Sequence, residues 1–184
     1  QGVLPPGMPG HLARFRGIEY DPDKAQQLLS QAGFPGGQGL ETLEILYNTQ
    51  EIEQRLWQYV DGNRERRGNK VRLKAMARGG FLETISSDQS DRCRGSWVAD
   101  YVHPENFLYT LFHSTNHGSN GNYTRYTNPS VDRLLDLARV EGNKIKRLSL
   151  YSASEKAIVQ DVPAVFLFYG SCEVLLKKRF SGLV

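Results

Sequence analysis

The stretch GSWVADYVHPENFL, residues 95–108, places one carboxylate among aromatic side chains, a combination that can bind a cation. Asp100 stands between Trp97 and Tyr101. The carboxylate supplies the charge opposite to an ammonium group, while aromatic rings exclude water and add a cation–π attraction. The local sequence leaves a structural alternative open, in which Asp100 caps the helix that begins near Pro104 or holds a loop.

Arg94 precedes this stretch and is a second candidate for ligand binding. Its planar guanidinium could fork onto a ligand carboxylate. The alternative is an ordinary strand arginine that pairs with Asp88 or Asp91. Arg94 and Asp100 share parity along an extended strand, but six residues of straight strand span roughly 20 Å. Both could therefore hold one short ligand only if the chain bends between them.

Neither a metal site nor a catalytic motif stands out in the sequence. His113 and His117 have the spacing of two ligands on one helix face, but Gly118 indicates a loop, and His103 does not provide a convincing third ligand. We expect no metal and no cofactor. Gly-x-Ser-x-Gly and Walker motifs are absent. A hydrolase that uses Asp100 with His103 stays an alternative, although no nucleophile is evident, and so does a protein-interaction module.

The composition is that of an ordinary globular protein, and the length suits one domain with a real core or two very small ones. The chain has 184 residues, 39% hydrophobic and 23% charged, and a net charge of +3. The small charge argues against a dedicated nucleic-acid partner. Cys93 and Cys172 are too few for a disulfide scaffold, and they could pair or stay as small buried residues. No apolar run approaches the roughly 20 residues that span a bilayer. The ends, GVLPPGMPG and KKRFSGLV, lack a clear terminal element and suggest a fragment.

Hydrophobic periodicity predicts alternating strands and helices. Asp21 is a good N-cap and Pro22 a good first residue for a helix with an apolar stripe at residues 25, 28, 29 and 32. Further helices are expected at about 51–66, 79–86, 105–112, 129–138 and 143–160, and strands at 43–47, 71–75, 92–99, 164–169 and 173–177.

This order predicts a layered α/β domain with a mixed, largely parallel sheet flanked by helices. In such sheets ligands gather at the carboxyl ends of the strands. Asp100 would sit at such an end, because the strand predicted over 92–99 stops there.

Five stretches together resemble one family: GVLPPGMPG, YDPDKAQQLLSQAGFPGG, RGSWVADYVHPENFLYTLFHS, NYTRYTNPSVDRLLDLA and RLSLYSASEKAIVQDVPAVFLFY. In this order and spacing, the chain from residue 2 to about 169 is similar to the family 5 extracellular solute-binding proteins, the receptors of peptide-type ABC importers. Residues 60–93 keep the expected pattern of elements but carry little exact motif. The wider family also includes receptors for nickel chelates, haem, oligosaccharides and opines, so a peptide ligand is the default.

The resemblance implies a fold and a role for each candidate residue. Such receptors are two-lobed and type II-like, and residues 1–184 look like one α/β lobe, the continuous second lobe of a larger protein. Asp100 would bind the free α-amino group of a dipeptide, oligopeptide or other small solute, Trp97 and Tyr101 would wall the site, and Arg94 would meet a ligand carboxylate, as in some relatives. The implied partners are the first lobe and the ABC permease, and the implied location is periplasmic or extracellular, with lipoprotein anchoring. No enzymatic activity is expected.

Overall fold

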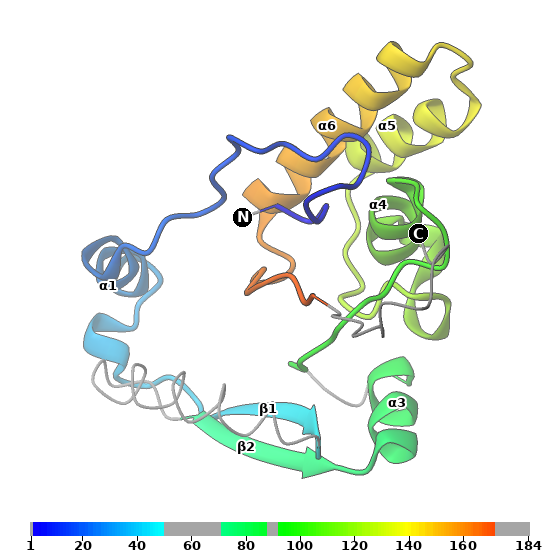
Figure 1. Ribbon diagram of the computed structural model, residues 1–184. Helices are drawn as coiled ribbons and strands as arrows, with labels where there is room; N and C mark the ends of the chain where they lie inside the picture. Colours follow the sequence, from blue (N-terminus) through cyan, green and yellow to red (C-terminus); the bar gives the residue numbers. More distant parts are fainter. Residues whose placement is uncertain (1, 50–70, 88–91, 172–184) are drawn as a thin grey trace, which may run out of the picture.

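The computed structural model describes residues 2–49, 71–87 and 92–171. Figure 1 shows a group of helices at the upper right and a sheet at the bottom, with one further helix at the left and another at the lower right. The α-helices and strands described are α1 (Pro22–Gln31), β1 (Leu43–Asn48), β2 (Val71–Met76), α3 (Arg78–Ser86), α4 (Glu105–Phe112), α5 (Pro129–Val140) and α6 (Lys144–Asp161), with short 3-10 turns at Pro35–Gly37, Ser114–Asn116 and Gly118–Asn120.

The larger hydrophobic core lies among α4, α5 and α6 and the first residues of the chain. Its fully buried members include Leu4 from the start of the chain, Leu108 from α4, Leu135 from α5, and Tyr151 and Ile158 from α6. Burying a leucine or isoleucine side chain stabilises the fold by about 1.5–3 kcal/mol. The N-terminal loop is therefore part of this core and closes it from one side.

Side-chain caps set where α1, α5 and α6 begin. The Asp21 carboxylate accepts a hydrogen bond from the amide of Lys24 at 2.9 Å, as predicted. Asn128 accepts from the Ser130 amide at 2.9 Å, and Asn143 accepts from the Ile145 amide at 3.0 Å. Each cap satisfies amides that would otherwise lack a partner in the first helical turn.

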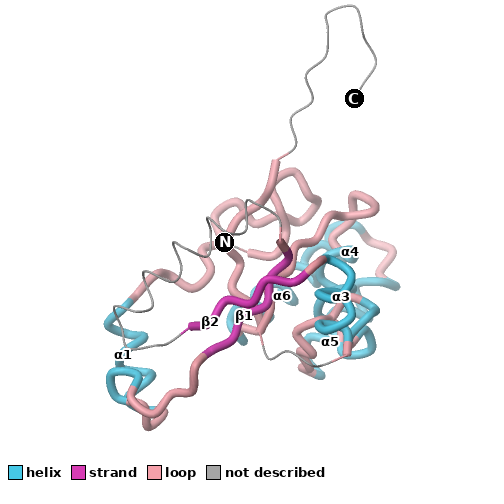
Figure 2. Tube along the Cα trace, turned by 90° about the horizontal axis from the view of Figure 1, so that it is seen from below, coloured by secondary structure: helices cyan, strands magenta, loops and turns pink. Residues whose placement is uncertain are grey.

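The strands β1 and β2 form a parallel pair, whose register runs from Leu43 opposite Val71 to Asn48 opposite Met76. Figure 2 shows the two strands side by side, with α3 beyond one end of the pair. A smaller core of Leu46, Phe81 and Ile85 joins the sheet to α3. The parallel pair and the helices confirm the predicted α/β class.

The strand predicted over 92–99 is wrong except for one bridge. Cys93 pairs in parallel with Leu46, whose backbone bonds to residues on either side of Cys93. Beyond that point the chain leaves the sheet, because Trp97 and Ala99 pack against the core of α4–α6. Gly95 lies at the departure and weakens a strand, since it offers no side chain to pack.

The buried strand predicted over 164–169 is also wrong. Residues 163–171 form no regular element, and Val165 and Phe168 are exposed. Phe166 does pack inward, with its ring edge against Phe112. The described residues supply no neighbouring strand with which this segment could pair. The helix expected at 51–66, the strand at 173–177 and Cys172 lie outside the described residues.

The helix α1 begins as predicted but does not bury its apolar stripe against the described residues. Leu28, in the middle of the stripe, is 53% exposed, and α1 has no buried residue. In Figure 1 it stands apart from α4–α6. Within the described ranges, none of the helices is both long enough and apolar enough to cross a membrane.

Candidate functional site

A hydrogen-bonded group at the start of α4 holds two of the four predicted site residues together. Asn106, in the first turn of α4, accepts a hydrogen bond from the Trp97 indole nitrogen Nε1 at 2.8 Å through its Oδ1 atom. The same oxygen accepts from the Asp100 amide at 3.4 Å, and Asn106 Nδ2 donates to Asp100 Oδ2, also at 3.4 Å. One amide side chain therefore joins Trp97 and Asp100, which the sequence predicted to act together.

Asp100 is exposed, and its second carboxylate oxygen accepts no hydrogen bond from the described residues. Exposed apolar side chains lie on both sides of it along the chain: Val98 is 86% exposed, Tyr101 50% and Val102 74%. A carboxylate with open acceptor capacity can bind a cation, and the exposed apolar groups beside it can cover the apolar part of the same ligand.

Trp97 lies behind this surface rather than on it. Its ring is half-buried and packs against the core of α4–α6. The alternation from Trp97 to Asp100, with Trp97 and Ala99 directed inward and Val98 and Asp100 outward, is that of extended chain. Trp97 thus fixes the backbone from which Asp100 projects.

Arg94 does not belong to the group around Asn106. Its backbone amide donates to the Leu46 carbonyl at 2.9 Å, which places it at the sheet edge. Its guanidinium lies 5.9 Å from the centre of the Phe168 ring. No contact between Arg94 and Asp100 in the described structure therefore supports the idea that both bind one short ligand.

His103, the partner of Asp100 in the hydrolase alternative, is engaged elsewhere. Its Nδ1 atom accepts from the Glu105 amide at 3.3 Å and lies 3.7 Å from the Glu105 carboxylate. The ring meets Tyr151 edge-on, with centroids 5.6 Å apart. Burial is the main reason that the pKa of the Tyr151 hydroxyl rises to about 12. His103 therefore contacts Glu105 and a neutral tyrosine, and it does not orient Asp100.

The histidines at 113 and 117 serve the packing of α4 and its following loop. His113 is buried, stacks on Tyr109 with ring centroids 4.3 Å apart, and lies 3.3 Å from the Asp136 carboxylate. His117 bonds to the carbonyl of Tyr126 at 3.2 Å. Among the described residues no group of three potential ligands could hold a metal ion.

Asn106, Val98 and Val102 are the site residues that sequence reasoning missed. Asn106 carried a usable signal, because it is polar and directly precedes the apolar Phe107 and Leu108 in a predicted helix. A polar residue on the buried face of a helix requires hydrogen-bond partners. Val98 and Val102 carried no signal, since single exposed valines are common on protein surfaces.

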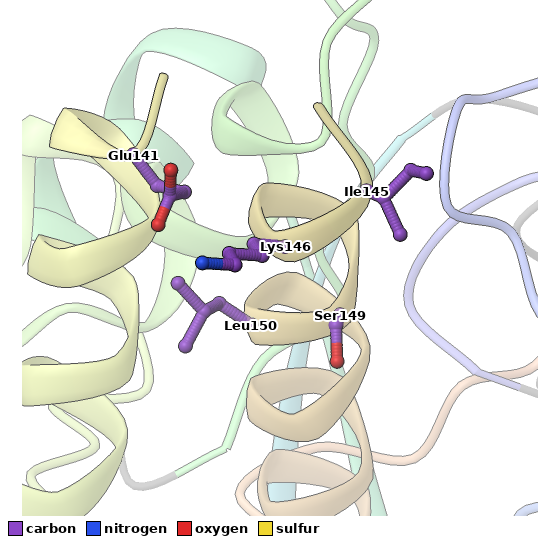
Figure 3. A pocket seen from close by; sticks show the side chains of 5 residues that line it. All are labelled: Glu141, Ile145, Lys146, Ser149 and Leu150. Carbon is purple, nitrogen blue, oxygen red and sulfur yellow. The ribbon is translucent and has the colours of Figure 1, made fainter. Parts of the chain in front are cut away.

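Two depressions in the surface lie apart from the Asn106 group. One, of about 430 Å³, lies at the turn between α5 and α6 and is lined by Glu141, Ile145, Lys146, Ser149 and Leu150 (Figure 3). The other, of about 230 Å³, lies between the N-terminal loop and α6 and includes Glu155 and Tyr169. Neither contains a predicted site residue.

Glu155 organises the second depression by holding the start of the chain. It is 1% exposed, and its Oε1 atom accepts from the amides of Val3 and Leu4 at 2.7 and 2.9 Å. Burial raises the pKa of this carboxyl group, although the two amide bonds and nearby positive charge oppose the rise. Tyr169 donates to the Gly2 carbonyl at 2.9 Å, so the start of the chain is also held by the segment that follows α6.

Comparisons with known proteins identify the family of the chain. Residues 1–119 match the model of the bacterial extracellular solute-binding proteins, family 5, middle region. The chain belongs to this family.

Several of the relatives are named as peptide-binding proteins. The chain is 32% identical over 160 residues to the periplasmic murein peptide-binding protein MppA of Escherichia coli, covering 86% of this chain and 29% of that protein. It is 29% identical over 161 residues to the periplasmic oligopeptide-binding protein OppA of Salmonella typhimurium, covering 87% of this chain and 29% of OppA. The chain therefore spans less than a third of the length of these two relatives.

Solved structures show the same fold. The periplasmic binding protein DppA of Helicobacter pylori, in complex with the peptide STSA, superposes with a TM-score of 0.79 at 25% identity, covering 88% of this chain and 31% of DppA. The unliganded open form of MppA superposes with a TM-score of 0.74 at 29% identity, covering 88% of this chain and 32% of that protein. The predicted fold class and the predicted family are both confirmed.

Proposed function

We propose that residues 1–184 form the continuous second lobe of a peptide receptor that serves an ABC importer. The observation that carries the proposal is the exposed Asp100 carboxylate, tethered through Asn106 and flanked by exposed apolar side chains. The relatives named for murein peptide and oligopeptide binding support a peptide as ligand. The receptor binds and delivers the ligand without carrying out a reaction on it.

In the proposed complex, Asp100 pairs with the α-amino group of a dipeptide, oligopeptide or similar small solute. Tyr101 and the neighbouring valines cover the first ligand residue, and Trp97 supports Asp100 from the core side. The first lobe of the same parent protein closes over this surface, and exclusion of water strengthens the charge pair. Arg94, from the sheet edge, meets a carboxylate farther along the ligand.

The remaining partners and the location follow from the same proposal. A receptor of this kind delivers its ligand to the ABC permease, and it acts in the periplasm or on the outer cell surface. The periplasmic names of the relatives support the location. Lipoprotein anchoring of the parent protein is part of the proposal and is tested by metabolic labelling with a radioactive fatty acid.

The test of the binding role uses the full-length receptor and two probes, trialanine and N-acetyl-trialanine, measured by calorimetry. Removing one partner of a buried charge pair costs about 3–5 kcal/mol, so Asp100→Ala should weaken trialanine binding by about two to three decades. The acetylated probe, which has no ammonium group, should bind the wild type weakly and hardly respond to the substitution.

A matched control is Asp23→Asn, which removes an exposed acid in α1, away from the α4–α6 core. It should leave the affinity for both probes unchanged. Equal binding of trialanine by wild type and Asp100→Ala would refute the assigned role of Asp100. The 184-residue chain alone presents half of the cleft and should bind trialanine far more weakly than the full receptor, so nanomolar binding by this chain would contradict the two-lobe proposal.

A further inference from the structure

Asn106 is buried to 3% exposure, yet its amide serves the preceding loop rather than its own helix. It lies one residue inside α4, and the next two residues, Phe107 and Leu108, belong to the main core. A buried amide without partners destabilises a fold by about 1–3 kcal/mol. All hydrogen bonds of the Asn106 side chain within the described structure go to Trp97 and Asp100.

The three hydrogen bonds fix different parts of the loop. The bond from the Trp97 indole, at 2.8 Å, holds a large ring that already packs on the core. The bond from the Asp100 amide holds the backbone, and the bond to Oδ2 selects the side-chain rotation. Because Oδ2 faces the amide, the other oxygen of Asp100 is left to receive a ligand.

Other titratable groups near the start of α4 do not provide this constraint. His103 and Glu105 interact with each other, and Glu105 also pairs with Arg139 at 2.8 Å. The hydroxyl groups of Tyr101 and Tyr151 form no hydrogen bond with Asp100 in the described structure. In the described structure, Asn106 is the one side chain that bonds to the Asp100 carboxylate.

We propose that Asn106 is a positioning residue that orients Asp100 for the ligand ammonium without touching the ligand. This inference rests on the proposed function and deepens it, because it assigns the orientation of the binding carboxylate to a buried amide. The geometry also predicts that Asn106 acts on affinity only through Asp100. A residue that merely stabilised the fold would affect every ligand alike.

The test is a double-substitution cycle in the full-length receptor, with the same two probes. Asn106→Leu keeps a side chain of similar size but removes all three hydrogen bonds. Because hydrogen bonds to charged groups are the stronger ones, it should weaken trialanine binding about tenfold. N-acetyl-trialanine binding should stay unchanged. In a receptor that already carries Asp100→Asn, the same substitution should have little further effect.

Asn106→Asp is the second variant, because it keeps an oxygen for the Trp97 indole and replaces only the donor that faces Asp100. Two carboxylates at this separation tend to share one proton. Trialanine affinity should then depend on pH between about 5 and 7, a range in which the ligand amine stays protonated and the wild type stays nearly flat. The emission of Trp97 should resemble the wild type. Subtraction of a Trp97→Phe background isolates that emission.

The control is Asn122→Asp, which places a carboxylate at an equally buried amide of the loop after α4. Asn122 bonds to the carbonyls of His113 and Tyr126. The control should lower stability but leave the affinity ratio of the two probes and its pH dependence unchanged. Folding of each variant is verified by circular dichroism before binding is measured.

The outcomes separate the two proposals. In one combination of results, the wild type prefers trialanine to N-acetyl-trialanine while folded Asn106→Leu binds trialanine unchanged and Asn106→Asp shows no pH dependence. That combination overturns the positioning role alone. An equal loss from Asn106→Leu with and without Asp100→Asn also overturns it. A wild-type receptor that binds both probes equally overturns the proposed function and the positioning role together.

Discussion

Two regions of the molecule are packed differently, although their elements begin and end in similar ways. One contains α4, α5 and α6, and the other contains α1, β1, β2 and α3. Twelve buried hydrophobic residues form the core of the first region, whereas the described core between the sheet and α3 has three. An antiparallel hairpin of long helices can bury both stripes on each other. A two-stranded sheet needs further layers to cover its faces. The candidate site lies at the edge of the well-packed region, where a rigid scaffold can hold an exposed loop.

The largest difference between the regions is expected from one leucine in each. Leu135 is fully buried in α5, and Leu28 is more than half exposed in α1. Leu135→Ala should lower the free energy of unfolding by about 2–5 kcal/mol because it leaves a cavity. Leu28→Ala should change it by less than about 0.5 kcal/mol. Urea titration followed by circular dichroism measures both, and similar losses would show that α1 is covered in solution.

The next effect concerns Glu155, which anchors the start of the chain to α6. Glu155→Ala leaves the buried amides of Val3 and Leu4 without their acceptor, and each orphaned amide costs about 1–3 kcal/mol. Glu155→Gln keeps an acceptor oxygen and should restore most of the stability at neutral pH. Thermal unfolding of the two variants and the wild type at pH 7 measures the difference. If both variants unfold at the same temperature, the hydrogen bonds from the Val3 and Leu4 amides do not stabilise the chain.

The same group gives a pH dependence with a defined sign. Burial raises the pKa of Glu155 in the folded protein, so the folded state binds this proton more readily than the unfolded state. The resulting destabilisation is complete above the raised folded pKa and is lost as pH falls below the unfolded value. The wild type should therefore gain stability relative to Glu155→Gln as the pH is lowered from 7. A constant difference across a pH series of urea titrations would contradict the raised pKa.

The sequence predicted local structure well where a single segment contains the necessary information. The helix start at Asp21 follows from an N-cap followed by proline and is found as predicted. Asn128 followed by Pro129 is the same start signal in the sequence, and the structure has α5 begin there. The strand β1 follows from the alternation of Leu43, Ile45 and Tyr47. These features depend on residues within one turn or one strand, so tertiary contacts have little chance to override them.

The failures occur where distant contacts decide. Residues 92–99 were predicted as a strand, but the attraction of Trp97 to the helical core takes the chain off the sheet after Cys93. At the site, the sequence identified Asp100 with its aromatic neighbours but missed Asn106, because the bond between them depends on how α4 turns back on the loop. The roles of Asp100, Trp97, Tyr101 and Arg94 stay predictions.

A smaller effect is expected from the two predicted N-caps, which allow the same substitution in each region. Asn128→Ala and Asp21→Ala should each cost the helix about 1 kcal/mol. In α5 the loss should appear in global unfolding, since α5 packs on α4 and α6. In α1 it should appear only as faster amide hydrogen exchange within the helix, because an unpacked helix opens locally. Equal losses in global stability would show that α1 unfolds together with the core.

The smallest effect is expected from two charged pairs of similar exposure. Lys74 and Glu44 lie 3.3 Å apart on the strands β2 and β1. Arg139 of α5 pairs with Glu105 at 2.8 Å and also lies 4.2 Å above the Tyr109 ring of α4.

Lys74→Ala should cost at most about 0.5 kcal/mol, and this loss should vanish in 1 M salt because exposed charges are screened. Arg139→Ala should cost about 1 kcal/mol and keep part of that loss in salt, since the ring contact also excludes water. Urea titrations at low and high salt separate the two terms. If salt abolishes both losses, the contact between α4 and α5 at Arg139 is no stronger than an ordinary surface ion pair, and the tighter packing of this region does not extend to its exposed edge.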